Sequence, residues 1–155
     1  MKINEILKSV KSGKISTKDA KKLLTLYSIE EVENFAKIDI NRSKRRGVPE
    51  VIFAETKELE DTKKIIKKTL EKTNSVIVSR IKKEDYKKIL IFSKKLKVKI
   101  QTGKNSSSIL LFKKPIKFHG GKVGILTAGT SDIGVAEEAR LMCEAMNCRC
   151  ITSYD

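Results

Sequence analysis

The chain has 155 residues, enough for one ordinary domain or for a small domain with part of another. A hydrophobic content of 39% permits a packed core, and a net charge of +15 points to anionic partners. Three cysteines, all between residues 143 and 150, are too few and too local for a disulfide framework. No signal peptide and no apolar run of the ~20 residues that a membrane span needs is visible, so we expect a soluble, cytoplasmic protein.

The N-terminal segment, residues 1–47, is predicted to be helical. Apolar residues recur at helical spacing within residues 3–10, and Gly13 follows where a C-terminal cap belongs. Ser16 opens a second helix, with Asp19 placed to satisfy a free amide at its start. A short third helix is expected to begin near Ile29.

Residues 48–117 are predicted to form a small α/β module, which follows a charged linker over residues 39–50 with Gly47 and Pro49 as breakers. Strands are expected at 51–53, 76–78, 98–101 and 108–112, and helices at 57–72 and 83–95. This βαβαββ order implies at least one parallel pairing, because a helical crossover joins parallel strands most easily.

Residues 118–155 read as the opening of a doubly wound parallel sheet. A strand over 122–127 is followed by a loop of small residues over 128–132, a helix over 133–146 and a second strand over 148–152. The helix is expected to bury Val135, Ala136, Ala139, Met142, Cys143 and Met146. Such a domain normally has four or more strands, so we expect this unit to be incomplete in the chain. The predicted fold class is therefore α/β.

The loop Ala128-Gly129-Thr130-Ser131-Asp132 carries the strongest chemical signal. Small residues between a buried strand and a helix allow backbone amides to approach a ligand closely. The following helix would present free N–H groups and the positive end of its dipole, which favour a phosphate or carboxylate. Ser131 and Asp132 are also good N-cap residues, so a plain helix start is the alternative. Glu137 and Glu138 read as first-turn acids that complement the helix dipole.

Two stretches of the chain carry a resemblance to a known family. Residues 121–139, GKVGILTAGTSDIGVAEEA, resemble the start of the carboxylase domain of pyridinium-biscarboxylate mononucleotide synthase (LarB), which is itself similar to the aminoimidazole ribonucleotide carboxylase of purine synthesis (PurE). The pattern D-x-x-R-x-x-R-x-G-x-P-E-V-I, from Asp39 to Ile52, resembles the synthase's N-terminal signature, which continues at Lys57. The resemblance covers nearly the whole chain.

The resemblance implies an enzyme of nickel-pincer cofactor synthesis. Members of the family carboxylate the pyridinium ring of nicotinic acid adenine dinucleotide with CO2 or bicarbonate. They also hydrolyse its phosphoanhydride and release AMP. By analogy, Ser131 and Asp132 would contact ribose and phosphate, and Ala128, Gly129 and Thr130 would supply backbone contacts. No cofactor and no metal site is identified, and a divalent metal requirement is left open.

Three basic residues of the N-terminal signature are further candidates for substrate binding. Arg42 and Arg45 could hold a phosphate through two hydrogen bonds each, or they could form surface ion pairs with Asp39 or Glu50. Lys57 has the same two interpretations.

The family's glycine-rich His-Arg motif and its late nucleophilic cysteine have no counterpart in this sequence, so the catalytic residues stay unassigned. Cys143, Cys148 and Cys150 are expected to be buried structural thiols, and no fourth ligand at suitable spacing completes a metal site. His119 is interpreted as part of a joint before Gly120-Gly121 rather than as a base. A separate C-terminal piece is the partner expected to reassemble with this chain into an active enzyme, and the full-length family is expected to form homo-oligomers.

Two other functions are considered. A purine-type carboxylase fragment would explain the loop but not residues 1–112. A non-catalytic nucleotide- or RNA-binding remnant would use the basic surface, since twelve lysines between residues 82 and 117 face only Glu84 and Asp85. Specific nucleic-acid binding is disfavoured, because aromatic residues are few and no RNA-binding signature or zinc-finger spacing is present.

Overall fold

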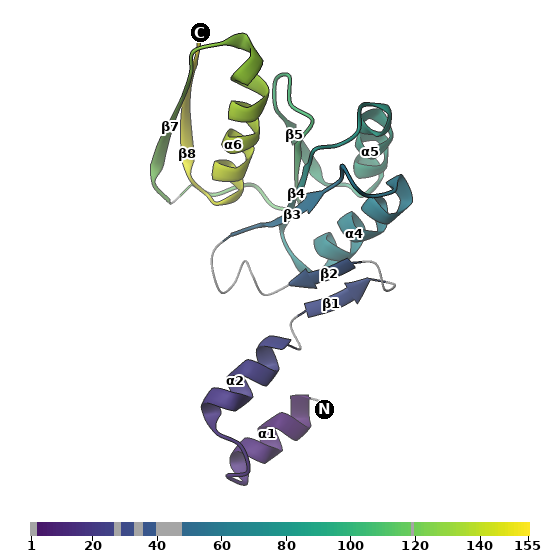
Figure 1. Ribbon diagram of the computed structural model, residues 1–155, viewed down its shortest axis with the longest axis vertical. Helices are drawn as coiled ribbons and strands as arrows, with labels where there is room; N and C mark the ends of the chain where they lie inside the picture. Colours follow the sequence, from purple (N-terminus) through teal and green to yellow (C-terminus); the bar gives the residue numbers. More distant parts are fainter. Residues whose placement is uncertain (1–2, 27–28, 33–35, 40–47, 119) are drawn as a thin grey trace. The chain divides into compact units, whose positions relative to one another are not determined.

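The computed structural model describes residues 3–26, 29–32, 36–39, 48–118 and 120–155. The chain divides into two compact units, residues 1–41 and residues 42–155 (Figure 1). The architecture is α/β, with a helical N-terminal part, a four-stranded mixed sheet and a two-stranded parallel sheet, so the predicted fold class is confirmed. The predicted domain boundaries at residues 47/48 and 117/118 stay a prediction.

The first unit begins with two helices, α1 (Ile3–Lys11) and α2 (Thr17–Leu26). Gly13 follows α1 with a φ of 71°, the left-handed conformation expected of a glycine cap. The Ser16 hydroxyl oxygen accepts a hydrogen bond from the Asp19 amide (3.0 Å) and donates one to the Asp19 carboxylate (2.6 Å). Both predicted helices are therefore present, and Ser16 supplies the cap at the start of α2.

The prediction of a third helix near Ile29 is wrong. Strands β1 (Ile29–Val32) and β2 (Ala36–Asp39) pair antiparallel here, from Ile29 opposite Asp39 to Val32 opposite Ala36. The segment is short for an independent helix and contains several β-branched residues, which favour a strand. A close antiparallel partner three residues away supplies the hydrogen bonds that a strand requires.

The second unit is built on a sheet with strand order β3-β4-β6-β5. Its strands are β3 (Glu50–Phe53), β4 (Ser75–Ser79), β5 (Lys99–Thr102) and β6 (Ile109–Phe112). β3 and β4 are parallel, as the sequence predicts, and β6 runs antiparallel to both β4 and β5. The ends of β3, β4 and β5 that lead to Ala54, Arg80 and Gly103 therefore lie along one edge of the sheet.

Helices cover both faces of this sheet. Helices α4 (Leu59–Lys72) and α5 (Lys83–Lys95) lie on one side, and α6 (Ile133–Ala145) lies on the other (Figure 1). α4 contacts β3 and β4, whereas α6 contacts β4 and β6. Ile77, Leu110 and Leu141 form a buried cluster between the sheet and α6. Because β4 is covered on both faces, four of its five residues are buried.

Strands β7 (Lys122–Thr127) and β8 (Arg149–Tyr154) form a separate parallel pair, also in contact with α6. The predicted strand–loop–helix–strand order is therefore present. Asn147 makes the turn into β8 with a φ of 62°. Neither strand contains a fully buried residue.

The predicted buried face of α6 is only partly correct. Ala136 is buried, and Met142 and Cys143 are half-buried, but Val135, Ala139 and Met146 are exposed. The buried residues are instead Ile133, Ala136, Glu137 and Leu141. The reason is that α6 lies between two sheets, so the residues facing the larger central sheet are the ones that become fully buried.

Several large apolar side chains of the β7–α6–β8 unit are exposed to solvent. Leu126 is 81% exposed, Val135 71% and Ile151 64%. Parallel sheets are normally covered on both faces, so this degree of exposure is unusual. None of the helices in the described part of the chain combines the length and apolar character that crossing a bilayer requires.

Candidate functional site

The turn between β7 and α6 is open toward solvent at its backbone amides. β7 ends at Thr127, a single 3-10 turn covers Thr130–Asp132, and α6 begins at Ile133. Within the described ranges, the N–H groups of Ala128, Gly129 and Thr130 donate no hydrogen bond to another protein group. These donors lie at the positive end of a 13-residue helix, so together they suit an anionic group.

Ser131 and Asp132 do not cap the helix. Both side chains are exposed, and α6 has no side-chain hydrogen bond at its N-cap residue, Asp132. The Ser131 hydroxyl instead donates to the Asp132 carboxylate at 3.3 Å. The alternative reading of these residues as ordinary capping residues is therefore not what the structure shows, and both side chains remain accessible to a ligand.

A shallow cavity of about 470 Å³ lies beside this turn. It brings Ala128 and Asp132 together with apolar side chains of β7 and α6; its lining is Ile125, Leu126, Thr127, Ala128, Asp132, Val135, Ala136 and Ala139. The hydroxyl oxygen of Thr127 is buried and has no hydrogen-bond partner in the described part of the chain. A buried hydroxyl without a partner is energetically unfavourable, and a ligand in the cavity could satisfy it. Thr127 is not among the binding residues that the sequence predicts.

The structure describes one of the three basic candidates from the N-terminal signature. Arg42 and Arg45 fall outside the described residues. Lys57 is half-buried in a turn after β3, where its amide donates to the Ala54 carbonyl at 3.1 Å. That turn is at the carboxyl end of β3, next to the end of β4, where the Ser79 hydroxyl donates to the Glu138 carboxylate of α6. Lys57 and the Glu138 side chain of α6 therefore lie at the same end of the central sheet, where β3 and β4 end.

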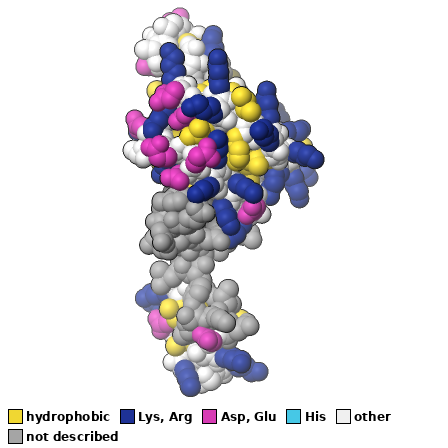
Figure 2. Space-filling model, turned by 90° about the vertical axis from the view of Figure 1, so that its right-hand side faces the viewer, with side chains coloured by type: hydrophobic (Ala, Val, Ile, Leu, Met, Phe, Trp, Pro, Cys, Tyr) yellow, Lys and Arg dark blue, Asp and Glu magenta, His cyan; other side chains and the backbone are white. Residues whose placement is uncertain are grey.

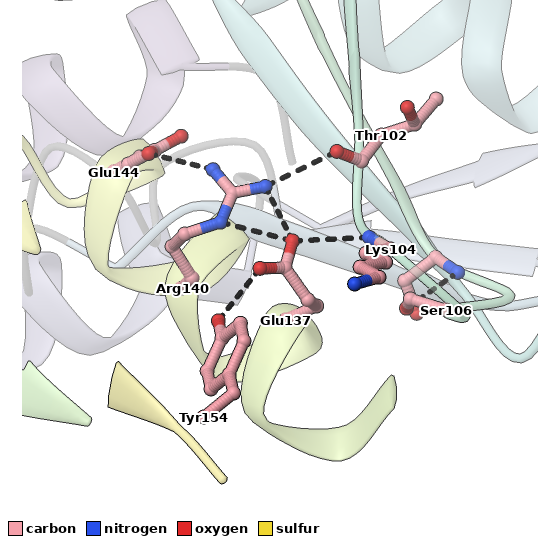
Figure 3. Close-up of polar contacts among 8 residues, drawn as sticks. Thr102, Lys104, Ser106, Glu137, Arg140, Glu144 and Tyr154 are labelled. Carbon is pink, nitrogen blue, oxygen red and sulfur yellow. Dashed lines mark hydrogen bonds and ion pairs between the residues drawn. The ribbon is translucent and has the colours of Figure 1, made fainter. Parts of the chain in front are cut away.

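Glu137 is the centre of a polar cluster that the sequence analysis missed (Figure 3). Glu137 is 6% exposed and lies in the second turn of α6, so its interpretation as a first-turn acid is wrong. Its carboxylate accepts hydrogen bonds from Arg140 (2.7 and 3.0 Å), from the Tyr154 hydroxyl (2.6 Å) and from the Lys104 amide (3.2 Å). Arg140 also donates to Glu144 at 2.7 Å and to the Thr102 carbonyl at 3.1 Å.

This cluster joins three segments that are distant in sequence: the loop after β5, helix α6 and the end of β8. Only the spacing of Glu137, Arg140 and Glu144 on one helix face could have indicated it from the sequence. Two glycines make the close approach possible. A Cβ atom on Gly103 would lie 2.7 Å from that of Glu137, and one on Gly134 would lie 2.4 Å from the Asn105 carbonyl oxygen.

The cluster fixes the charge of its members. Burial alone would raise the pKa of Glu137, but hydrogen bonds from Arg140, Tyr154 and the Lys104 amide outweigh that effect, so the pKa is lowered. The hydrogen bond to Glu137 in turn raises the pKa of Arg140. Burial, and then the hydrogen bond to Glu137, raise the pKa of Tyr154. At neutral pH the cluster is therefore a paired carboxylate and guanidinium with a neutral phenol, as a structural joint requires.

The cysteines differ from the prediction that they are buried. Cys143, Cys148 and Cys150 are free and half-buried. Burial, followed by the neighbouring Cys143 thiol, raises the pKa of Cys150 to about 11, so it is a thiol rather than a thiolate at neutral pH. In the described ranges, no group of three or more His, Cys, Asp or Glu side chains is placed to hold a metal ion. His119 lies outside those ranges.

The fold and the β7–α6 turn define an α/β protein with a mixed central sheet and, beside it, a turn whose free amides suit an anion. Comparison with known families then places the chain: it belongs to the family with the LarB/PurE-like N-terminal domain, whose model matches residues 29–106, half of the chain. The match runs from β1 into the loop after β5, so the β7–α6 turn lies beyond it.

The chain is also 38% identical over 157 residues to the uncharacterized protein MJ0165 of Methanocaldococcus jannaschii. The alignment covers 99% of this chain and 60% of that protein. The chain therefore spans about 60% of the length of this relative, and the similarity includes the β7–α6 turn.

Proposed function

We propose that the β7–α6 turn binds the phosphate and ribose of a nicotinate dinucleotide, and that the chain acts in nickel-pincer cofactor synthesis. The observation that carries the proposal is the set of unoccupied amides at Ala128, Gly129 and Thr130, at the start of α6. Membership of the LarB/PurE-like family supports the choice of substrate. The reaction would carboxylate nicotinic acid adenine dinucleotide and hydrolyse its phosphoanhydride, giving pyridinium-biscarboxylate mononucleotide and AMP.

The geometry supports different roles for the residues of the turn. The amides of Ala128, Gly129 and Thr130 can hold phosphate oxygens, which accept hydrogen bonds only. The Asp132 carboxylate would repel a phosphate but can accept hydrogen bonds from ribose hydroxyls, and Ser131 can donate or accept. The apolar wall made by Leu126 and Val135 suits an uncharged part of the ligand. These are binding roles, separate from the bond-making step.

The proposal is tested by calorimetry with nicotinic acid adenine dinucleotide. The double substitution Ser131→Ala with Asp132→Asn is expected to weaken binding of the dinucleotide roughly tenfold or more, because contacts to the ribose are lost. A matched control, Ser12→Ala with Asp61→Asn, makes the same chemical changes away from the turn and should bind like the unmodified chain. Equal binding by both variants would contradict the proposal. A steep salt dependence with short RNA and no dinucleotide preference would indicate an RNA-binding protein instead.

We further propose that the exposed face of the β7–β8 pair is covered in the active enzyme by further polypeptide, which packs on this face and adds strands to the edges of the sheet. Leu126 and Ile151 are 81% and 64% exposed, and a two-stranded parallel sheet with no buried residue is not a stable layer by itself. The additional strands would complete the walls of the cavity beside the turn. The length of the Methanocaldococcus relative not covered by this chain offers a source for such strands.

This second proposal is tested by mixing the chain with a polypeptide that comprises the uncovered part of that relative. A complex is expected in analytical ultracentrifugation, and Leu126→Lys with Ile151→Lys should abolish it. The control Ile91→Lys changes another apolar residue, 57% exposed on α5, and should leave the complex intact. Failure of the unmodified chain to form the complex, or its dimerisation through the same face, would overturn the proposal.

A further inference from the structure

A second cavity lies on the central sheet, away from the β7–α6 turn. It measures about 600 Å³, within the range of small-molecule sites. The first two turns of α5 form one wall, and the loop between β5 and β6 forms the other; the lining is Ile81, Lys83, Tyr86, Lys87, Gly103, Asn105, Ser106 and Ser107. The two cavities share no lining residue.

Two lysines and several hydrogen-bond donors line this cavity. Lys83 and Lys87 are exposed, and neither side-chain ammonium group has a hydrogen bond or ion pair to another described residue. The lining contains no carboxylate. The amides of Asn105 and Ser107 also donate no hydrogen bond in the described part of the chain. Unpaired ammonium groups and free amides around one cavity suit a phosphate group.

The rest of the lining is apolar. Ile81 is 3% exposed, and the ring of Tyr86 is half-buried beside it. Burial raises the pKa of Tyr86, so its hydroxyl is neutral at physiological pH and can donate a hydrogen bond. An aromatic or apolar part of a ligand would therefore find a matching surface next to the phosphate-binding groups.

Helix α6 holds the loop that forms one wall of the cavity. The Glu137 carboxylate accepts a hydrogen bond from the Lys104 amide, and Gly134 packs directly against the Asn105 carbonyl. Asn105 has a φ of 55°, a conformation that asparagine tolerates better than most residues. Because the loop is fixed before a ligand arrives, little conformational entropy is lost on binding.

Many basic side chains lie on this side of the molecule. Figure 2 shows the side on which α4 and α5 lie in Figure 1: Lys and Arg side chains lie around exposed hydrophobic ones, and Asp and Glu side chains gather on one part of the same face. The positive potential of such a surface raises the local concentration of anions and draws them toward the cavity.

We propose that the cavity between α5 and the β5–β6 loop is a second ligand site, which binds a small phosphorylated compound with an aromatic or apolar part. The site goes beyond the dinucleotide-binding turn and does not depend on it. It gives part of the lysine-rich segment a specific role in place of a generally solvated surface.

AMP is a suitable probe, with adenosine as the analogue that lacks the phosphate. In ¹⁵N-resolved NMR titrations of the full chain, AMP is expected to shift the amides of Gly103, Asn105 and Ser107, and adenosine to shift them much less. Lys83→Gln with Lys87→Gln should weaken AMP binding at these amides roughly tenfold. Lys94→Gln with Lys95→Gln removes the same charge from the last turn of α5, and AMP binding should be unchanged.

Ser131→Ala with Asp132→Asn separates the two sites, because these changes should leave the shifts at Gly103 and Asn105 intact. Shifts confined to residues 127–133 would overturn the second site while leaving the first in place. Equal weakening by the two lysine pairs would also overturn it, because the effect would then come from overall charge.

Discussion

Glu137 is a buried carboxylate whose three kinds of partner come from α6, β8 and the loop after β5. Replacing it by Gln, as Glu137→Gln, keeps the shape but removes the charge that Arg140 and Tyr154 need. We expect the free energy of unfolding at pH 7 to fall by about 1.5–3 kcal/mol, the usual range for hydrogen bonds to a charged group. Urea denaturation measures this change.

The same variant predicts a pH dependence. The pKa of Glu137 is lowered from its ordinary value of 4.5 in the folded chain, so its contribution to stability is fully present above about pH 4.5. That contribution is lost as the pH falls through the lowered pKa. The stability difference between the unmodified chain and Glu137→Gln should therefore shrink below pH 4.5. A constant difference down to pH 2 would show that the charge of Glu137 is not what stabilises the cluster.

Gly134 gives a second prediction at this scale. Alanine in a helix is normally more stable than glycine by about 0.5–1 kcal/mol. A Cβ atom at Gly134 would, however, lie 2.4 Å from the backbone oxygen of Asn105, which cannot move without shifting the loop. Gly134→Ala should therefore destabilise the chain by about 1–3 kcal/mol. Gly124→Ala is the control, since a Cβ there meets nothing within 4 Å. Thermal unfolding of both variants distinguishes the two cases.

At the scale of the elements, the sequence predicted most strands and helices of the second unit correctly. The helix over residues 83–95 and the strand over 122–127 have the predicted bounds, because apolar periodicity and flanking breakers are clear there. The β1–β2 hairpin was missed because four-residue strands carry too little periodicity to be told from a helix. The buried face of α6 was partly wrong because its sequence is apolar on several sides.

The location of the candidate site could be predicted from the sequence, but the arrangement of its side chains could not. Its position after β7 follows from the small residues of the turn, which are visible in the sequence. Whether Ser131 and Asp132 cap α6 depends on side-chain conformation, which the sequence does not specify. The Glu137 cluster depends on contacts between distant residues, such as Glu137 with the Lys104 amide, 33 positions away. The second cavity likewise brings residues 81–87 together with residues 103–107. Local patterns contain no information about such pairs.

At the scale of the whole second unit, α6 takes part in two structures. Through Leu141 it belongs to the core of the central sheet, and it also packs on β7 and β8. The first two helical turns of α6 contact both the β7–α6 turn and the loop that lines the second cavity. A change in the position of α6 would therefore alter the geometry of both proposed sites, because both are built partly on this helix.

The two-stranded β7–β8 sheet has a further consequence for how the chain behaves in solution. In the described part of the chain, the outer edges of β7 and β8 have no strand beside them, and such edges tend to pair between molecules. A net charge of +15 opposes this by electrostatic repulsion between copies. Because dissolved salt screens that repulsion, buffers of high ionic strength chosen to suppress unspecific anion binding would at the same time promote self-association.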